Sequence, residues 1–385
     1  MEERTRAYLR GRFGDYYRRS DPTPPPDANE REWGYVPWTE GPGETYIRHN
    51  SLLDIGNLGE FLARERPKHV YFSAGRYRNP GASTMAEKSW QSSDLIFDLD
   101  ADHLPSTDPD DSYAEMLAAC KDALLRLLDF LETDFGFDDL TVVFSGSRGY
   151  HVHVRDETVK PLDGDARREI VDYVRGIGLD PESLIRTEMR GNATARVLPT
   201  EGGWGRRVHR RLMSFVEDVE TFDEAAAKER LQELDGIGEG RAETVYGAIR
   251  KNRQAIENGN MEAGGVGIRT LVDSLVSEVV EAENAPIDEP VSTDVNRLIR
   301  LPGSLHGGSG LAVRRVPREE VGDFDPLSDA IPETFRSHEI VVEVTDGGRF
   351  EFDGDTFTLE EREHTIPEYL GVFLMCRGRA EKGRE

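Results

Sequence analysis

The stretch that most constrains this chain is a short apolar run with acidic side chains, Asp94-Leu-Ile-Phe-Asp98-Leu-Asp100. The run is short for a helix and ends at a polar turn over residues 101–103, so a buried strand is predicted. Because side chains alternate along a strand, Asp98 and Asp100 lie on one face, with their Cα atoms roughly 6.5 Å apart. Two carboxylates at that spacing can converge on one or two hard cations. The alternative is a pair of strand-end acids that face water, and the pattern alone does not decide.

The charge of the chain is large and unevenly arranged. Acids outnumber bases by 74 to 48, and the net charge of −26, taken as an average, argues against a nucleic-acid partner. The bases nevertheless cluster, and arginine, which binds phosphate bidentately, greatly outnumbers lysine. We therefore expect an acidic surface coat with basic functional grooves. The three basic clusters are Arg4, Arg6, Arg10, Arg12, Arg18 and Arg19; Arg206, Arg207, His209, Arg210 and Arg211; and Arg297, Arg300, His306, Arg314 and Arg315.

Length and composition predict a globular protein of more than one part. A chain of 385 residues favours two lobes, or a core with a large insertion. Its two cysteines, Cys120 and Cys376, make neither a disulfide framework nor a four-thiolate zinc site, which suits a reducing cytoplasm. No apolar run approaches the length of a membrane span, and the first residues do not form a signal peptide. We expect a cytoplasmic protein without a membrane partner.

A second informative stretch joins two predicted strands, 140–144 and 150–154. The turn between them, Ser145-Gly-Ser-Arg-Gly149, can form an anion-binding nest of backbone N–H groups, to which Ser145 and Arg148 add donors. Alternation places His151 and His153 on one face, with His151 nearer to an anion in the turn. A phosphate contact, a metal pair and a structural pair all remain open for these histidines. A zinc pair ranks last because no further ligands are evident nearby.

A third stretch runs from Ser292 to His306. A short helix, capped by Ser292 or Thr293 and ended by Pro302-Gly303, is predicted to bury Val295, Leu298 and Ile299. Asp294 is then either a first-turn acid that complements the helix dipole or a third metal ligand. Arg300 and His306 are either surface bases or contacts to a triphosphate.

Other segments are predicted from their patterns. Lys88 is interpreted as a solvated loop lysine, with a contact to the Asp98 and Asp100 site as the alternative. The Gly-rich turn at 234–241 is interpreted as a helix connection, with a nucleic-acid-binding hairpin as the alternative. The amphipathic segment at 366–378 is expected to pack on the core, with packing on a partner as the alternative. Further helices are predicted over 4–19, 58–66, 111–135, 165–176 and 222–234, and a strand over 69–73.

Three motifs together resemble the small catalytic subunit of archaeal and eukaryotic DNA primase, and they follow that family's order. They are Phe97-Asp-Leu-Asp-Ala-Asp-His103, Phe144-Ser-Gly-Ser-Arg-Gly-Tyr-His-Val-His153 and Asp294-Val-Asn-Arg-Leu-Ile-Arg-Leu-Pro-Gly-Ser-Leu-His306. Residues 31–35 and 367–374 are also similar to the family, so the resemblance covers nearly the whole chain. The acidic composition suggests a haloarchaeal member. The resemblance implies a mixed α/β catalytic core, formed by residues 1–160 plus 286–385, with a mainly helical inserted subdomain at 161–285.

The resemblance also implies an activity and its residues. The protein is expected to synthesise short primers de novo from nucleoside triphosphates on single-stranded DNA, together with a primase large subunit. A repair or translesion primase-polymerase and a non-enzymatic nucleic-acid-binding subunit are the alternatives. The zinc knob of many archaeal members has no counterpart here, because residues 105–119 lack cysteine. The implied ligands of two Mg²⁺ or Mn²⁺ ions are Asp98, Asp100 and Asp294, and the implied nucleotide contacts are Ser145, Arg148, His151, Arg300 and His306.

Overall fold

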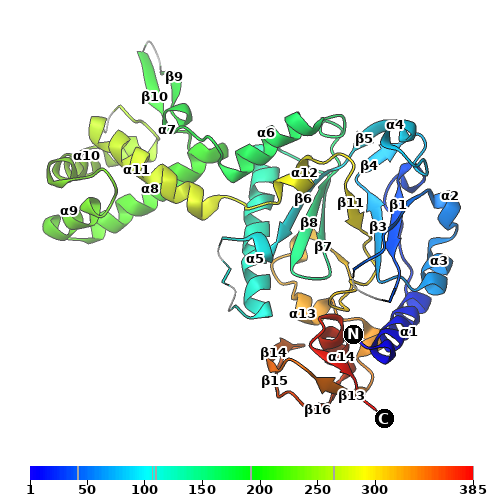
Figure 1. Ribbon diagram of the computed structural model, residues 1–385. Coiled ribbons are helices and arrows are strands. Elements are labelled where there is room, and N and C mark those ends of the chain that lie inside the picture. The colour runs from blue at the N-terminus through cyan, green and yellow to red at the C-terminus, as the bar shows by residue number, and fades with distance from the viewer. Residues whose placement is uncertain (41–42, 106, 109–110, 191–192, 263–264, 385) are drawn as a thin grey trace. The chain divides into compact units, whose positions relative to one another are not determined.

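The computed structural model describes residues 1–384 except 41–42, 106, 109–110, 191–192 and 263–264. Helices and several sheets alternate along the chain, so the predicted mixed α/β fold is confirmed (Figure 1). The described residues divide into two compact units. The first comprises 1–125, 138–171 and 286–385, and the second comprises 126–137 and 172–285.

Two four-stranded antiparallel sheets form the centre of the first unit (Figure 1). One sheet has the strand order β11-β3-β1-β2, and the other has the order β12-β7-β8-β6. The strands predicted around residues 69–73, 95–99, 140–144 and 150–154 are all confirmed. The bounds are Trp33–Val36 for β1, Ile47–Asn50 for β2, His69–Ser73 for β3, Leu95–Asp100 for β6, Leu140–Phe144 for β7, Gly149–Val154 for β8, Leu298–Arg300 for β11 and Arg314–Val316 for β12.

Strand β6 has the alternation that the sequence predicts. Phe97 and Leu99 are fully buried, and the Leu99 carbonyl accepts a hydrogen bond from the Cys120 thiol of α5 (Tyr113–Asp129) at 3.7 Å. Cys120 is therefore a core thiol. The opposite face carries Asp98 and Asp100, which pair in register with His151 and Gly149 of β8. The apolar face thus anchors β6 to the core and leaves the two acids on the other side.

Smaller elements complete the first unit. Strand β13 lies between β16 and β17, while β14 pairs with β15 and β4 with β5. Helix α14 (Glu368–Cys376) is almost wholly buried, so its predicted packing on the core is confirmed. The remaining bounds are Glu3–Arg19 for α1, Leu52–Ile55 for α2, Leu58–Glu65 for α3, Gly75–Tyr77 for β4, Met85–Lys88 for α4, Trp90–Ser93 for β5, Gly164–Arg175 for α6, Glu289–Thr293 for α12, Pro326–Asp329 for α13, Glu339–Val344 for β13, Gly348–Phe352 for β14, Asp355–Leu359 for β15, Glu363–Pro367 for β16 and Ala380–Lys382 for β17.

The second unit is mainly helical and includes one two-stranded ribbon, β9 with β10. Leu212, Ile249 and Leu275 contribute fully buried side chains from three of its helices. The Gly-rich segment at 234–241, predicted as a helix connection, joins α9 to α10, and its last three residues form the start of α10. No described helix has the length and apolar character needed to cross a membrane. The bounds are Pro181–Leu184 for α7, Arg186–Arg190 for β9, Ala193–Val197 for β10, Gly203–Thr221 for α8, Glu224–Gln232 for α9, Glu239–Glu257 for α10 and Gly265–Glu283 for α11.

One predicted element is wrong. The helix expected to begin at Ser292 or Thr293 and to run past Ile299 instead ends at Thr293, and Leu298–Arg300 is strand β11. The reason is tertiary, because β11 pairs with the edge of β3 and thereby satisfies its backbone groups. Asp294 therefore follows α12 as its C-terminal cap residue and is not a first-turn acid.

Candidate active site

A pocket of about 490 Å³ in the first unit brings three separated motifs together. Asp98, His151, Asp294 and Arg300, each singled out from the sequence, line this pocket. Four further predicted residues, Asp100, Ser145, Arg148 and His306, are not among its lining. The other lining residues are Tyr46, Arg48, Tyr71, Asn296, Arg297, Leu298 and Ile299.

Asp98 of β6 and His151 of β8 contact each other across the two paired strands. His151 Nε2 lies 3.3 Å from Asp98 Oδ1, and the His151 ring is almost fully buried. Burial alone would raise the pKa of Asp98, but His151, followed by Arg300 and Arg297, keeps that pKa below its usual range. The carboxylate is therefore ionised at neutral pH. His153, on the same face, stacks on Phe72 in the core with no hydrogen-bond partner for either ring nitrogen among the described residues, so it takes no part in the pocket.

Asp294 reaches the pocket because the segment that carries it is tied to the core. The Asp288 N–H donates to the Asp98 carbonyl at 2.9 Å, and the Ala74 N–H donates to the Arg297 carbonyl at 2.7 Å. The Asp294 carboxylate is exposed and accepts from the Asn296 N–H at 2.8 Å. The two acids thus come to one pocket from chain positions nearly two hundred residues apart.

A backbone hydrogen bond closes the turn at 145–149, and a neighbouring loop that includes Ser309 contacts the turn. The Ser145 N–H donates to the Gly149 carbonyl at 2.9 Å, and the Ser309 hydroxyl donates to the Gly146 carbonyl. Gly146 has a φ of +84°, and a Cβ added there would lie 2.7 Å from the Cβ of His306. Only glycine fits this position, and its presence lets His306 approach the turn.

His306 is buried and neutral. Burial, reinforced by Arg300 and His69, lowers the pKa of His306 well below its usual range. The Gly308 N–H donates to His306 Nδ1 at 3.1 Å, which leaves the ring proton on Nε2. A neutral imidazole with an Nε2–H donor can bind a phosphate oxygen.

Two predicted arginines differ in their surroundings. Arg148 forms an ion pair with Asp102, with both side chains partly exposed. Arg300 lies over the ring of Tyr71, with its guanidinium carbon 5.7 Å from the ring centroid, and has no acidic partner within 4 Å among the described side chains. Arg300 is therefore available to an anionic ligand, while Arg148 is engaged with Asp102.

The donor chemistry suits a hard cation, although the acids are not preassembled. Asp98, Asp100 and Asp294 offer the carboxylate oxygens that Mg²⁺ and Mn²⁺ prefer. Within the described part of the chain, no three His, Cys, Asp or Glu side chains already form a group that could hold a metal ion. Asp98 bonds His151, and Asp100 accepts from the Asp102 N–H at 3.1 Å.

Glu32, a buried acid that contacts the pocket residue Arg48, was not predicted from the sequence. Glu32 is fully buried and pairs with both Lys88 and Arg48. Lys88 is also fully buried, so its interpretation as a solvated loop lysine is wrong. A fully buried lysine is held by a carboxylate partner, and Glu32 supplies it from 56 residues away. Nothing local in the sequence marks that pairing.

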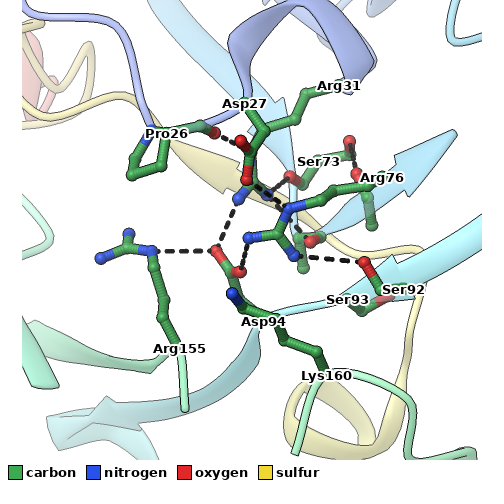
Figure 2. Close-up of polar contacts among 12 residues, drawn as sticks. Pro26, Asp27, Arg31, Ser73, Arg76, Ser92, Ser93, Asp94, Arg155 and Lys160 are labelled. Atoms are coloured by element: carbon green, nitrogen blue, oxygen red, sulfur yellow. Dashed lines mark hydrogen bonds and ion pairs between the residues drawn. The ribbon is translucent and has the colours of Figure 1, made fainter. Parts of the chain in front are cut away.

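A second buried acid, Asp94, lies immediately before β6 (Figure 2). Its carboxylate binds Arg31 at 2.8 Å, Arg76 at 2.6 Å and Arg155 at 3.2 Å, and Arg76 also binds Asp27 at 2.7 Å. Figure 2 shows these guanidiniums converging on Asp94. Asp94 therefore ties the start of β6 to three other chain segments.

The three basic clusters that were predicted to form functional grooves differ in whether their arginines pair with acids. In the second cluster every arginine pairs with an acid of the same unit; these are Arg206, Arg207, Arg210 and Arg211. The prediction of a basic functional groove at this cluster is therefore wrong. Much of the first cluster is neutralised in the same way. For Arg297, Arg300, Arg314 and Arg315 of the third cluster, no carboxylate lies within 4 Å among the described residues. Among the described residues, these four arginines of the third cluster are thus free of acidic partners, and Arg297 and Arg300 line the pocket.

A mixed α/β core whose pocket brings carboxylates together with arginines such as Arg297 and Arg300, which have no acidic partner among the described residues, is typical of enzymes that act on nucleotides. Residues 97–317 match the sequence model of the DNA primase small subunit family. The chain is 64% identical to the DNA primase small subunit PriS of Haloarcula marismortui, over the full length of both chains. The identity is 59% to the subunit of the same name from Halorubrum lacusprofundi and 39% to that from Methanococcoides burtonii, again over the full lengths. The chain belongs to the DNA primase small subunit family, as its three motifs predicted.

Proposed function

We propose that this chain is the catalytic subunit of a DNA primase that synthesises short primers de novo on single-stranded DNA. The observation that carries the proposal is the pocket in which Asp98, His151, Asp294 and Arg300 meet. Full-length similarity to subunits named DNA primase small subunit supports the same activity. The substrates are nucleoside triphosphates, and a primase large subunit is the expected partner in the cytoplasm.

Three acids, two of which line the pocket, are assigned to metal binding. Asp98, Asp100 and Asp294 would hold two Mg²⁺ or Mn²⁺ ions, whose chemistry is to lower the pKa of a 3′-hydroxyl and to neutralise charge on the leaving pyrophosphate. Asp98 is suited to this role because its depressed pKa keeps it ionised at neutral pH.

The basic groups are assigned to the triphosphate. Ser145, Arg148, His151 and the Nε2–H of His306 would bind the phosphates, together with backbone N–H groups of the 145–149 turn other than that of Ser145, which already bonds the Gly149 carbonyl. Arg300 adds a guanidinium without an acidic partner among the described residues. In the reaction the 3′-oxygen attacks the α-phosphorus, the bond to the β-phosphate oxygen breaks, and pyrophosphate leaves. Fixed donors aimed at the phosphates stabilise the charge that grows on that leaving group.

Primer synthesis by the purified chain tests the proposal. Labelled nucleotides and single-stranded DNA are supplied in high salt with Mg²⁺ or Mn²⁺, and native protein is compared with Asp98→Ala. Glu360→Ala, at an exposed acid outside the pocket, is the matched control. Metal-dependent products from native protein and the control, but not from folded Asp98→Ala, are expected. Near-native synthesis by Asp98→Ala would refute the assignment of the site.

Two rival functions predict other results. A repair or translesion primase-polymerase extends an existing primer but initiates poorly, so de novo initiation is scored against extension. A binding-only subunit gives no metal-dependent product even with the large subunit added.

A further inference from the structure

The floor of the pocket is one face of the β11-β3-β1-β2 sheet. Arg300, Tyr71 and Gly34 are paired in register across β11, β3 and β1, so they share this face. A Cβ added at Gly34 would lie 3.3 Å from Leu298 Cδ1 and 3.7 Å from Arg48 Cγ. The missing side chain at Gly34 therefore lets the side chains of Leu298 on β11 and Arg48 on the edge strand β2 approach each other over this face.

Tyr46, just before β2, is a large aromatic residue left exposed at this edge. Its side chain is 55% exposed, and its ring lies 6.1 Å from the Tyr71 ring at a tilt of 36°. Its hydroxyl donates to Glu44 at 3.3 Å, which fixes one end of the ring. One aromatic face thus remains open beside a charged pocket, an arrangement that suits stacking of a nucleobase.

Arg48 is held at the same edge by the buried acid Glu32. Nε and Nη2 of Arg48 lie 3.2 Å and 3.3 Å from the two Glu32 oxygens, while 40% of the Arg48 side chain is exposed. Glu32 also pairs with the buried cation Lys88. Because one carboxylate then pairs with two cations, it does not neutralise the positive charge of Arg48 completely. This leaves a fixed guanidinium whose other N–H groups can meet a phosphate.

We propose that Tyr46 and Arg48 bind one nucleotide of the single-stranded template, with Tyr46 stacked on its base and Arg48 bonded to its phosphate. Glu32 is then a positioning residue that holds Arg48. The proposal rests on the proposed primase function, because it names where the template lies. A polymer fits here better than a second mononucleotide, because β2 is the open edge of its sheet and the groups assigned to the triphosphate lie on other strands and loops.

Binding of a fluorescent single-stranded oligonucleotide, without metal or nucleotide, tests this independently of catalysis. Anisotropy is measured across a KCl series in which circular dichroism shows each variant folded. Tyr46→Ala and Arg48→Ala are expected to weaken binding at least about fivefold, the low end of the loss for one base stack. Tyr46→Phe, which keeps the ring, is expected to stay within about twofold of native. Arg64→Ala removes an exposed arginine of α3, outside the pocket, and serves as the matched control.

The salt dependence separates the two contacts. Loss of one phosphate contact to a single strand lowers the slope of log affinity against log salt by roughly 0.7, so Arg48→Ala should show this change and Tyr46→Ala should not. Unchanged oligonucleotide affinity in both alanine variants would overturn the proposal, and a raised nucleotide KM in the same variants would assign the edge to the incoming nucleotide. Absence of primer synthesis by native protein, with the oligonucleotide result intact, would refute the proposed function alone.

Discussion

Asp94 lies immediately before strand β6 and Asp98 lies within it, four residues further along, yet their surroundings are opposite. Asp94 is fully buried under the guanidiniums of Arg31, Arg76 and Arg155, whereas Asp98 borders an open pocket. The segment 94–98 therefore carries one acid that fixes the fold and one acid that is available for chemistry.

Replacement of Asp94 by Ala is expected to destabilise the protein by about 3–5 kcal/mol, because it leaves buried guanidiniums without their counter-charge. Urea unfolding at fixed salt measures this loss. The exposed Glu360→Ala variant, whose ion pair with Arg362 lies at the surface, should change stability by less than about 1 kcal/mol. A loss for Asp94→Ala as small as that of the control would mean that the buried network contributes little.

Acid pH is expected to destabilise the protein through its buried histidines. Burial lowers the pKa of His69, His153 and His306 well below the usual range, so they stay neutral in the folded state. Below about pH 6.5 the unfolded chain binds protons that the folded chain does not, so stability falls as the pH falls. Each such histidine adds up to about 1.4 kcal/mol per pH unit to the slope of the unfolding free energy against pH.

His153→Leu isolates one of these histidines. Neither ring nitrogen of His153 has a hydrogen-bond partner among the described residues, so an apolar side chain of similar size should cost less than about 1.5 kcal/mol at pH 8. Below pH 6.5 the variant should lose stability less steeply than native protein. Unfolding free energies measured from pH 8 to pH 5 test this, and parallel curves would show that His153 does not titrate differently on unfolding.

The local patterns of the sequence predicted well wherever the cause is local. The alternation of β6 was sufficient, as was the spacing of three and four residues between buried side chains of α5 such as Leu124, Leu127 and Leu128, because each element buries one apolar face. Leu298–Arg300 was predicted as helix because its strand state depends on pairing with β3, which no local pattern reveals. Tertiary pairing overrides local propensity in such short segments.

The charges were harder to predict for the same reason. Arg207 and Arg300 belong to similar arginine-rich stretches, yet Arg207 is buried against Asp129 and Asp134, while Arg300 lines the pocket. The partners of Arg207 lie more than seventy residues away, so composition could not distinguish the two. The acids Asp98 and Asp294 were found because their spacing is part of recognisable motifs. Glu32 lies in the 31–35 stretch that is similar to the family, but nothing local in the sequence predicts its buried pairing with Lys88 and Arg48.

Gly149 is expected to tolerate no side chain. A Cβ there would lie 2.0 Å from the Leu99 carbonyl oxygen, so Gly149→Ala must push β8 away from β6 beside Asp100. We expect a loss of at least about 2 kcal/mol in stability, together with loss of primer synthesis. Gly240→Ala, in the first turn of α10 with open space around it, is the matched control and should gain about 0.5–1 kcal/mol. Equal effects of the two substitutions in urea unfolding would contradict the close approach at Gly149.

The ion pair between Arg148 and Asp102 predicts a change in nucleotide affinity. If Arg148 binds the triphosphate, Asp102 competes for the same guanidinium, and both side chains are partly exposed. Asp102→Asn should therefore lower the nucleotide KM by up to about fivefold, since an exposed pair is worth at most about 1 kcal/mol. Arg148→Ala should raise the KM, and the double variant should resemble Arg148→Ala because the competing carboxylate no longer matters. Steady-state primer synthesis at varied nucleotide concentration measures all three variants. A lower KM for Asp102→Asn that persists in the double variant would show that Asp102 repels the nucleotide directly and does not act through Arg148.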